Sequence, residues 1–161
     1  MEAGALNLPP PPGLRPFAEL VITVGEAIEI GPLVGGGARR LVPITGGHCR
    51  ARDWQARVLA AGADFQRVVG GRVAYLEARY VLETDAGDRV YVDNRAIRSG
   101  PAELVARLAR GEPVDPALIY FRCAPSFETG SPALAWIMER LFVGSGIRRP
   151  AEVELAFFEV C

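Results

Sequence analysis

Apolar and polar residues alternate along most of this chain from Phe17 onward, and the three-to-four-residue spacing typical of helices is rare. The longest alternating run, residues 72–94, is interrupted by the turn segment 85–88, and this pattern predicts a β-hairpin. Further strands are predicted for shorter alternating runs that are bounded by turn-forming residues: 18–24, 27–31, 39–47, 117–125 and 151–160.

Glycine and proline mark the places where the predicted strands must bend. Pro43 has no N–H to donate to a sheet, so its strand is bulged or lies at an edge there, and the Gly-Gly pair at 46–47 permits a further bend. Gly62 divides residues 54–71 into two halves, which form either the two arms of a hairpin or one bent strand. His48 therefore follows a bend in its strand.

Two segments have helical character. Residues 99–111 begin with Ser-Gly-Pro, end in glycine and place Leu104, Val105 and Leu108 on one face, which predicts one short helix. Residues 131–146 begin with helical spacing but end as a strand would, so we expect a turn of helix that runs into a strand. About nine or ten strands against one or two short helices favour an all-β fold, a closed antiparallel β-barrel, because closure removes exposed strand edges.

The proline-rich segment 1–16 is predicted to form an extended arm that leads into a single β-barrel domain at 17–161. A chain of 161 residues buries enough surface to fold without a structural metal or disulfides. Its three cysteines are odd in number and lack a C-x-x-C pairing, which indicates a reducing compartment. We therefore expect a cytoplasmic protein.

The composition limits which kinds of partner the protein can have. Hydrophobic residues make up 50% of the chain and charged residues 23%, and 18 basic against 19 acidic residues give a net charge of −1. This balance provides no large field that would attract nucleic acid or an anionic membrane. No stretch reaches the roughly 20 apolar residues that a spanning helix needs. We therefore expect neither nucleic acid nor a membrane as a partner.

The residues needed for a metal site or an activated serine are missing. His48 is the only histidine, and its neighbour Cys49 would point to the opposite face of a strand, so we expect no metal site. The glycine-containing run 31–40 lacks the Lys-Ser/Thr pair of a phosphate-binding loop, and no G-x-S-x-G motif occurs. The sequence therefore predicts no cofactor.

Several polar side chains inside the predicted strands are candidates for a pocket. Arg79, Arg95 and Arg122 either extend outward or enter the barrel to pair with an acid or with a ligand. Asp64 is either a general base that faces an apolar lumen or a turn-capping residue after Gly62. The tyrosines and tryptophans suit an aromatic or planar ligand, although at strand spacing such residues are more often core.

Five segments of the chain form a recognisable pattern: VPITGGHCRA at 42–51, GADFQ at 62–66, ARYVLETDAGDRVYV at 78–92, YFRCAPSFETGSP at 120–132 and AWIMERLFVGSGIRR at 135–149. This pattern resembles a family of small bacterial and fungal proteins catalogued as domain of unknown function 3237 and as uncharacterised protein family 0311. The resemblance covers residues 17–160. It implies a closed antiparallel β-barrel, and because most members have no assigned activity, it leaves the chemistry open.

The resemblance also implies which residues line the barrel mouth. These are Asp64, Gln66, Arg79, Tyr80, Arg122, Glu128 and Trp136. His48 stands where a small hydroxyl residue is expected, and Leu134 and Met138 stand where Tyr and Asn are expected around the tryptophan. If these positions face the lumen, the pocket is more apolar and carries one imidazole, which suits proton transfer on a hydrophobic substrate.

We therefore predict a cofactor-free barrel enzyme of the isomerase, lyase or cyclase type, which moves a proton on a small hydrophobic or aromatic carbonyl-containing substrate. His48 or Asp64 would act as the base, and Arg79, Tyr80 or Arg122 would stabilise developing negative charge. The predicted substrate contacts are Gln66, Arg122, Glu128, Trp136 and Met138.

Two other interpretations stay open. One is a non-catalytic carrier or sensor with the same pocket, and the other is an oligomeric structural protein whose barrel is filled by its own side chains. A solidly packed lumen would support the structural protein, whereas an open cavity with Asp64 and His48 within reach of one point would support catalysis. The expected partners are a small-molecule ligand and further copies of the chain, with a dimer favoured.

Overall fold

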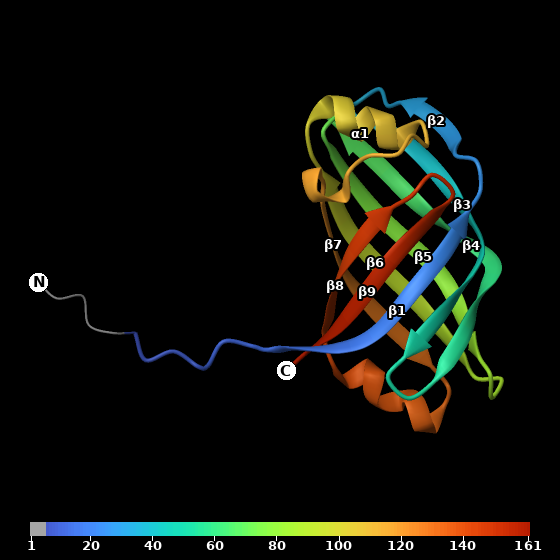
Figure 1. Ribbon diagram of the computed structural model, residues 1–161, viewed down its shortest axis with the longest axis vertical. Coiled ribbons are helices and arrows are strands. Elements are labelled where there is room, and N and C mark those ends of the chain that lie inside the picture. Colours follow the sequence, from blue (N-terminus) through green and yellow to red (C-terminus); the bar gives the residue numbers. More distant parts are fainter. Residues whose placement is uncertain (1–5) are drawn as a thin grey trace, which may run out of the picture.

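Antiparallel β-strands dominate the fold, which is seen in a computed structural model that describes residues 6–161 (Figure 1). The strands are β1 (Leu14–Val24), β2 (Ile28–Pro32), β3 (Ala38–Ala51), β4 (Gln55–Val69), β5 (Val73–Thr84), β6 (Arg89–Ser99), β7 (Tyr120–Thr129), β8 (Phe142–Arg148) and β9 (Glu152–Val160). One α-helix, α1 (Ala102–Ala109), and two 3₁₀ helices, η1 (Pro116–Leu118) and η2 (Pro132–Glu139), connect them.

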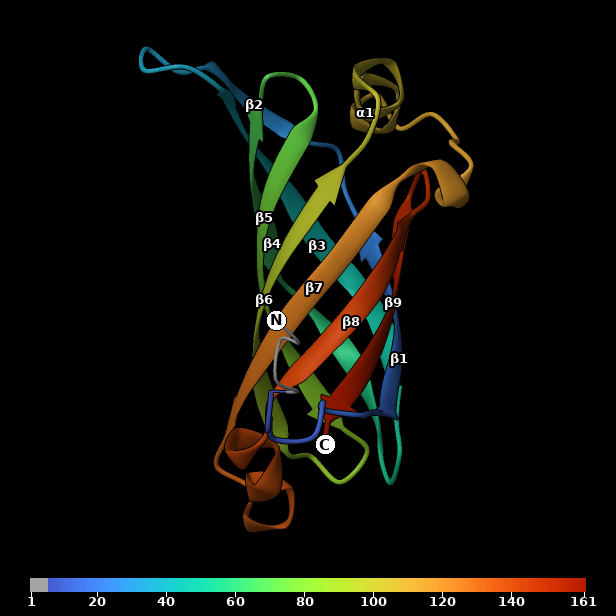
Figure 2. The same cartoon turned by 90° about the vertical axis from the view of Figure 1, so that its left-hand side faces the viewer.

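The sheet closes on itself. Its strand order is β1-β9-β8-β7-β6-β5-β4-β3-β2, and the additional pairing of β1 with β3 joins the two ends into an eight-stranded barrel (Figure 2). β1 pairs with residues 44–51 of β3, and β2 pairs with residues 38–41 of the same strand, so β2 extends the wall beyond the end of β1. The predicted all-β closed barrel is confirmed.

Two strands bend where glycine lets the neighbouring backbone approach closely. The register between β3 and β4 shifts between Pro43 and His48, and the register between β4 and β5 shifts between Val58 and Gly62. Gly62 has φ 120°, and a Cβ there would collide with the carbonyl oxygen of Arg79. Residues 54–71 therefore contribute one bent strand rather than a hairpin, which was one of the two predicted alternatives.

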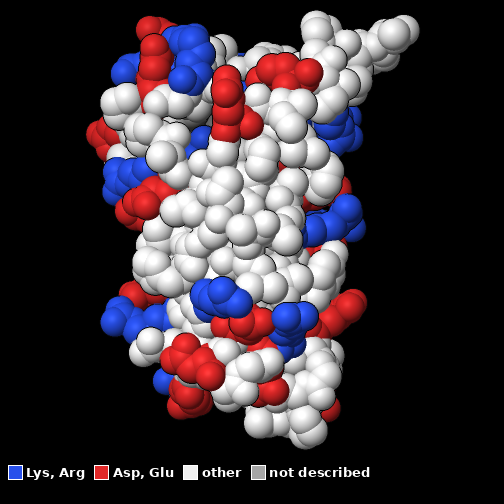
Figure 3. All heavy atoms as spheres, turned by 90° about the vertical axis from the view of Figure 1, so that its right-hand side faces the viewer, with Lys and Arg blue, Asp and Glu red and all other residues white. Residues whose placement is uncertain are grey.

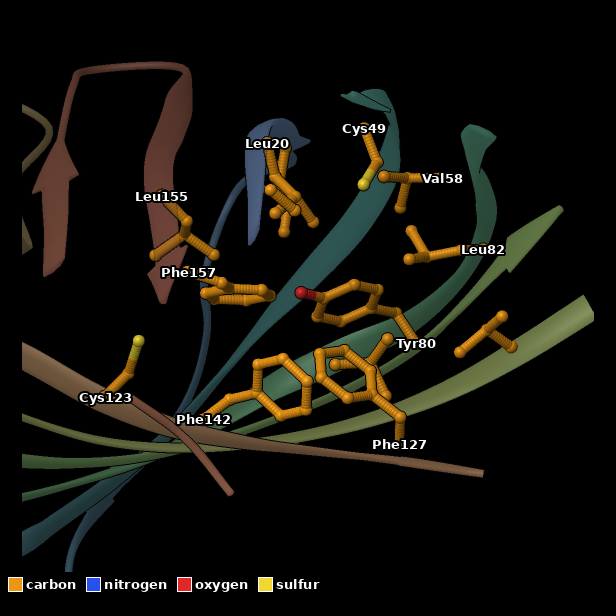
Figure 4. Close-up of a cluster of buried hydrophobic side chains, with 14 of the residues drawn as sticks. Leu20, Cys49, Val58, Tyr80, Leu82, Cys123, Phe127, Phe142, Leu155 and Phe157 are labelled. Carbon is orange, nitrogen blue, oxygen red and sulfur yellow. The ribbon is translucent and has the colours of Figure 1, made fainter. Parts of the chain in front are cut away.

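Aromatic side chains fill the end of the barrel that η2 covers. Phe17 packs against Phe142 with ring centroids 4.7 Å apart and against Trp136 at 5.6 Å. Phe127 lies 5.1 Å from Phe142, and Phe157 closes the group from β9 (Figure 4). We call this group the aromatic floor. It supplies the solid packing that the barrel needs at this end.

The opposite end is covered by α1, and here the predicted short helix is confirmed. Val105 and Leu108 are its buried residues, and Gly111, with φ 74°, follows its end. The second segment with helical character also folds as predicted, because η2 runs into β8. Among residues 6–161, no helix is long and apolar enough to cross a membrane.

The arm before the barrel is shorter than predicted, because the first strand of the barrel begins earlier in the chain. Residues 6–13 are exposed and form no strand, whereas β1 begins at Leu14, three residues before the predicted start of the domain. Residues 1–5 of the predicted arm lie outside the described residues. Gly13 and Cys161 exchange two backbone hydrogen bonds of 2.8 and 2.9 Å, which hold the two ends of the barrel chain together.

The outer wall carries charges of both signs. On the face at the right of Figure 1, basic and acidic side chains are interspersed and lie mostly toward the two ends of the barrel, while the middle of that face is uncharged (Figure 3). Arg57 and Glu83, 2.7 Å apart, are one of the outer-wall ion pairs. Charged side chains of the wall thus find partners outside the lumen.

Candidate functional site

Polar side chains gather inside the barrel at the end that α1 covers, around a cavity of about 40 Å³. The group consists of Asp64 and Gln66 from β4, Asn94 and Arg98 from β6, and Arg148 from β8. Alternate residues of a strand face the same side, so these residues share the inner face with the apolar residues of their own strands. The free space suits about three water molecules or a chemical group of similar size.

The register of the sheet shows which lining residues lie near the mouth of the barrel and which lie deeper. Asp64, Ala78 and Asn94 form one row across β4, β5 and β6. Arg98 lies farther along β6, one residue before the strand ends and the chain turns toward α1. Arg98 is therefore nearer the mouth, and the carboxyl group of Asp64 is deeper in the lumen.

Asp64 has one partnered and one free oxygen. Gln66 donates a hydrogen bond from Nε2 to Oδ2 of Asp64 over 2.7 Å, whereas Oδ1 is buried with no partner in the described residues. Burial raises the pKa of Asp64, and the hydrogen bond from Gln66 and the positive charge of Arg98 act in the opposite direction. A carboxyl group with a raised pKa can exchange a proton closer to neutral pH than a solvated one.

Arg98 is the most deeply buried charge in this group. Only 4% of the residue is exposed, its Nε has no hydrogen-bond partner, and among residues 6–161 no carboxylate lies within 4.0 Å of its guanidinium. The guanidinium carbon lies 5.6 Å from the ring centroid of Phe121. Burial lowers the pKa of Arg98 to about 10, so the group keeps its charge at neutral pH.

Two further arginines are tied to the rim of the cavity. Arg40 donates a hydrogen bond from Nη1 to the carbonyl oxygen of Ala109 over 3.0 Å, which ties the last turn of α1 to β3. Arg148 donates from Nη1 to the carbonyl oxygens of Arg149 and Glu152 over 2.8 and 3.3 Å. Arg40 also lies 3.5 Å from Glu29, so of the arginines around the cavity Arg98 and Arg148 are the two without a carboxylate within 4.0 Å in the described residues.

Of the sequence-predicted site residues, Asp64 and Gln66 face the cavity. Tyr80 also points into the lumen, but it lies beside the aromatic floor, with its hydroxyl directed toward Phe157 (Figure 4). That hydroxyl is buried without a partner in the described residues, and burial raises the pKa of Tyr80 well above its ordinary value. Tyr80 does not line the cavity around Asp64.

His48 lies on the outer wall, so it and Asp64 do not reach one common point. The residue is exposed on β3, between Val21 of β1 and Arg57 of β4. Its neighbour Cys49 takes the inward position and is buried, and adjacent residues of a strand face opposite sides. The imidazole is thus separated from the cavity by the barrel wall.

The other predicted residues also lie outside the cavity. Arg79 faces outward and pairs with Glu77 over 3.2 Å, and Arg122 extends over the ring of Tyr120. Glu128 is exposed on β7. The two η2 residues are at the opposite end of the barrel, where Trp136 packs on the aromatic floor and Met138 is 47% exposed.

Sequence reasoning missed Asn94, Arg98, Arg148 and Arg40. The signal was present in the alternation of β6, since Asn94 and Arg98 have the same parity as the buried residues Val90 and Val92. The candidate chosen from this strand, Arg95, has the other parity and is exposed. Choosing charged residues by strand membership alone therefore selected the wrong face.

Other parts of the chain offer weaker chemistry. A hollow of about 810 Å³ lies outside the barrel at the η2 end, between the turns after β3 and β5. Its residue Arg52 already pairs with Glu159 over 3.0 Å. In the described part of the chain, no three histidine, cysteine, aspartate or glutamate side chains are grouped so that they could hold a metal ion.

Comparison with known proteins identifies relatives over almost the whole chain. Residues 12–160 match the sequence model of a family described as "Protein of unknown function (DUF3237)". The chain is 46% identical over 137 residues to a UPF0311 protein of Rhodopseudomonas palustris, a match that covers 85% of this chain and 89% of the relative. These matches confirm the resemblance seen in the sequence.

Solved structures share the barrel. A protein of unknown function from R. palustris superposes with a TM-score of 0.87 at 40% identity, covering 96% of this chain and 100% of that one. A β-barrel-like protein from Acinetobacter baumannii gives 0.83 at 35% identity, covering 97% and 100%. A protein from Penicillium herquei described as an enzyme gives 0.72 at 16% identity, covering 98% and 100%, and at this identity the likeness shows the fold alone.

Proposed function

The chain belongs to the DUF3237 family, and from this starting point we propose that it is a cofactor-free enzyme that moves a proton on a small carbonyl-containing molecule held in the barrel. One observation carries the proposal: a buried carboxyl group with a free oxygen, Asp64 Oδ1, faces a cavity that also contains the unpaired cation Arg98. Titratable groups with perturbed pKa values inside a cavity are typical of catalytic sites.

The proposed step assigns roles to three side chains. The Asp64 carboxylate takes a proton from the carbon next to a substrate carbonyl, the electron pair of that C–H bond forms a C=C bond, and the π pair of the carbonyl moves to its oxygen. Arg98 and the amide N–H₂ of Asn94 stabilise the negative charge on that oxygen, because donors fixed in a dry cavity act without reorganisation. The same proton then returns from Asp64 to another carbon or to the oxygen.

The apolar lining supports this role for Asp64. Ile22, Val42, Leu76 and Leu155 line the same cavity and exclude water from the reacting atoms. His48, the other base considered from the sequence, has no path to the lumen through the barrel wall. An isomerase, a lyase or a cyclase that acts next to a carbonyl can begin with this proton abstraction, so the proposal covers the three predicted reaction types.

A non-catalytic carrier is the second candidate. The small free volume of about 40 Å³ and the tie between Arg40 and α1 favour it, because a closed, narrow site holds a ligand well but exchanges it slowly.

The free thiols of Cys49, Cys123 and Cys161 support our assignment to a reducing compartment such as the cytoplasm. The expected homo-oligomer, with a dimer favoured, stays a prediction.

Deuterium exchange tests the proposed chemistry directly. The protein is incubated in D₂O with acetylacetone, 2-oxobutyrate or acetoacetate, and deuterium at the carbon next to the carbonyl is followed by NMR. We expect exchange above the buffer rate for at least one compound, and a loss of about 100-fold or more in Asp64→Asn. Asp93→Asn, on the outer wall of β6, is the matched control and should keep the wild-type rate.

Two results would contradict the proposal in different ways. Equal exchange rates in the wild type and Asp64→Asn would remove Asp64 as the base. Binding of these compounds in the cavity without any enzyme-dependent exchange would favour the carrier.

A further inference from the structure

We propose that the molecule bound in the cavity is a short organic acid, a 2-oxo or 3-oxo monocarboxylate, whose carboxylate group binds Arg98 at the mouth while its carbonyl end extends toward Asp64. This inference rests on the proposed function, because it takes the same cavity as the ligand site. It goes further by naming the chemical class and the orientation of the ligand.

The first step of the argument is the missing partner of Arg98. A buried charge without a counter-charge is strongly destabilising, so structural arginines in protein interiors are paired. The partly buried Arg52 of this barrel follows that rule and lies 3.0 Å from a carboxylate oxygen of Glu159. Arg98 is more deeply buried, at 4% exposure, yet its Nε has no partner in the described residues. A bound anion would satisfy it.

The second step is the charge balance of the cavity. Arg98 and Arg148 both line it, Asp64 is the one acidic residue of the lining, and the charge of Arg40 nearby is met by Glu29 at 3.5 Å. Two guanidinium groups against one carboxyl group leave the lining with a net positive charge even when Asp64 is ionised. A neutral ligand would leave this charge uncompensated, whereas a ligand with a single negative charge would balance it.

The third step is size and shape. A guanidinium group binds a planar carboxylate through two parallel hydrogen bonds. The space of about 40 Å³ below it is lined by apolar residues such as Val42 and Leu76, so it suits a short carbon chain. A phosphate or a dicarboxylate would place a second anionic group deeper in the lumen, where no further arginine or lysine of the described residues lines the cavity and Asp64 would repel it.

The fourth step is the position of the acid relative to the cation. Arg98 lies near the end of β6, whereas Asp64 lies in the row that contains Asn94, farther from α1. A carboxylate at Arg98 therefore directs the carbons that follow it toward Asp64. A carbonyl one or two bonds from the carboxylate would then lie beside the group proposed to move its proton.

Calorimetry with matched ligands tests the inference. Wild-type protein is titrated with 2-oxobutyrate and with its neutral amide, 2-oxobutanamide, and the titrations are repeated with Arg98→Met and with Arg95→Met. Arg95 is exposed on the outer face of the same strand, so its variant is the control for the loss of one positive charge. We expect the wild type and Arg95→Met to bind the acid at least about tenfold more tightly than the amide, and Arg98→Met to lose this preference.

A second measurement separates a binding arginine from a structural one. If Arg98 is kept for a ligand, Arg98→Met removes an unpaired buried charge and raises the melting temperature of the ligand-free protein. A lower melting temperature in this variant would overturn the inference. It would also be overturned if acid and amide bound the wild type equally, or if no acid of the series from two to five carbons bound at millimolar concentration.

These outcomes are distinct from failure of the proposed function. Equal binding of acid and amide would leave proton exchange by Asp64 on neutral carbonyl compounds untouched. Conversely, Arg98-dependent binding of the acid without deuterium exchange would support the ligand class and refute the chemistry.

Discussion

Asp64 illustrates how one side chain can be held between opposing physical effects. Its burial disfavours the charged form, while the hydrogen bond from Gln66 and the nearby Arg98 favour it, and burial is the larger effect. The folded-state pKa is therefore raised above the ordinary value of 3.8. The side chain stabilises the fold less when it is ionised than when it is neutral.

The sign of the resulting pH dependence can be tested with Asp64→Asn. A raised folded-state pKa means that the contribution of Asp64 to stability is fully present below pH 3.8 and is lost as the pH rises through the folded-state pKa. We expect the variant to unfold at a higher denaturant concentration than the wild type at pH 7, and the difference to vanish toward pH 3.8. Urea unfolding at a series of pH values measures this. A variant that is less stable at pH 7 would show that the carboxylate is stabilised by its surroundings.

For single residues, the sequence predicts which side chains face the lumen only when the alternation of inner and outer positions along each strand is taken into account. Asp64 and Gln66, which the family resemblance places at the barrel mouth, lie two positions apart in β4 and share its inner face. Arg79 and Arg122 were chosen for lying in strands, but each has the parity of the outer wall. Parity also places Arg98 inside, and its lack of a partner could not be predicted, since that depends on which side chains the other strands bring to the same level.

At the scale of elements, the bend in β4 depends on close contact between two backbones. Gly62 combines φ 120° with a position where a Cβ would collide with the Arg79 carbonyl oxygen of β5. We expect Gly62→Ala to lower the free energy of unfolding by about 2 kcal/mol or more. Gly71 is the matched control, because it has φ 65° in the following turn with open space around it, and Gly71→Ala should cost about 1 kcal/mol.

Chemical denaturation of both variants measures the difference. Equal losses would mean that backbone conformation alone, rather than the contact between β4 and β5, requires glycine at position 62.

The elements themselves could largely be predicted from alternation and from turn residues. The hairpin of β5 and β6, the helix α1 and the passage from η2 into β8 all follow local patterns. The choice between a hairpin and a bent strand for residues 54–71 could not be made, because it depends on the pairing of both halves with β5 across the Gly62 shift. That pairing is a property of the sheet rather than of the segment.

For the whole molecule, the aromatic packing and the polar cavity occupy opposite ends of the barrel. The aromatic floor contains the packed rings, whereas the cavity is lined by the unpartnered atoms Asp64 Oδ1, Asn94 Oδ1 and Arg98 Nε. We expect Phe127→Ala to lower the free energy of unfolding by about 4 kcal/mol, because it opens a void among rings that cannot collapse. The exposed Leu118 is the control, and Leu118→Ala should change the free energy of unfolding by less than about 0.5 kcal/mol.

Guanidinium unfolding followed by tryptophan fluorescence gives both values. If Phe127→Ala lowers the free energy of unfolding only slightly, the aromatic floor is not the main source of the barrel's stability.

The paired hydrogen bonds between Gly13 and Cys161 have a consequence for how the chain can be rewired. Because the first and last strands of the barrel are neighbours, a short linker can join them without distorting the wall. New termini can then be opened at the exposed Gly70-Gly71 turn. Such a circular permutant would keep every strand pairing while moving the chain ends to the rim near the cavity around Asp64, where a reporter group could be attached to test for ligand entry.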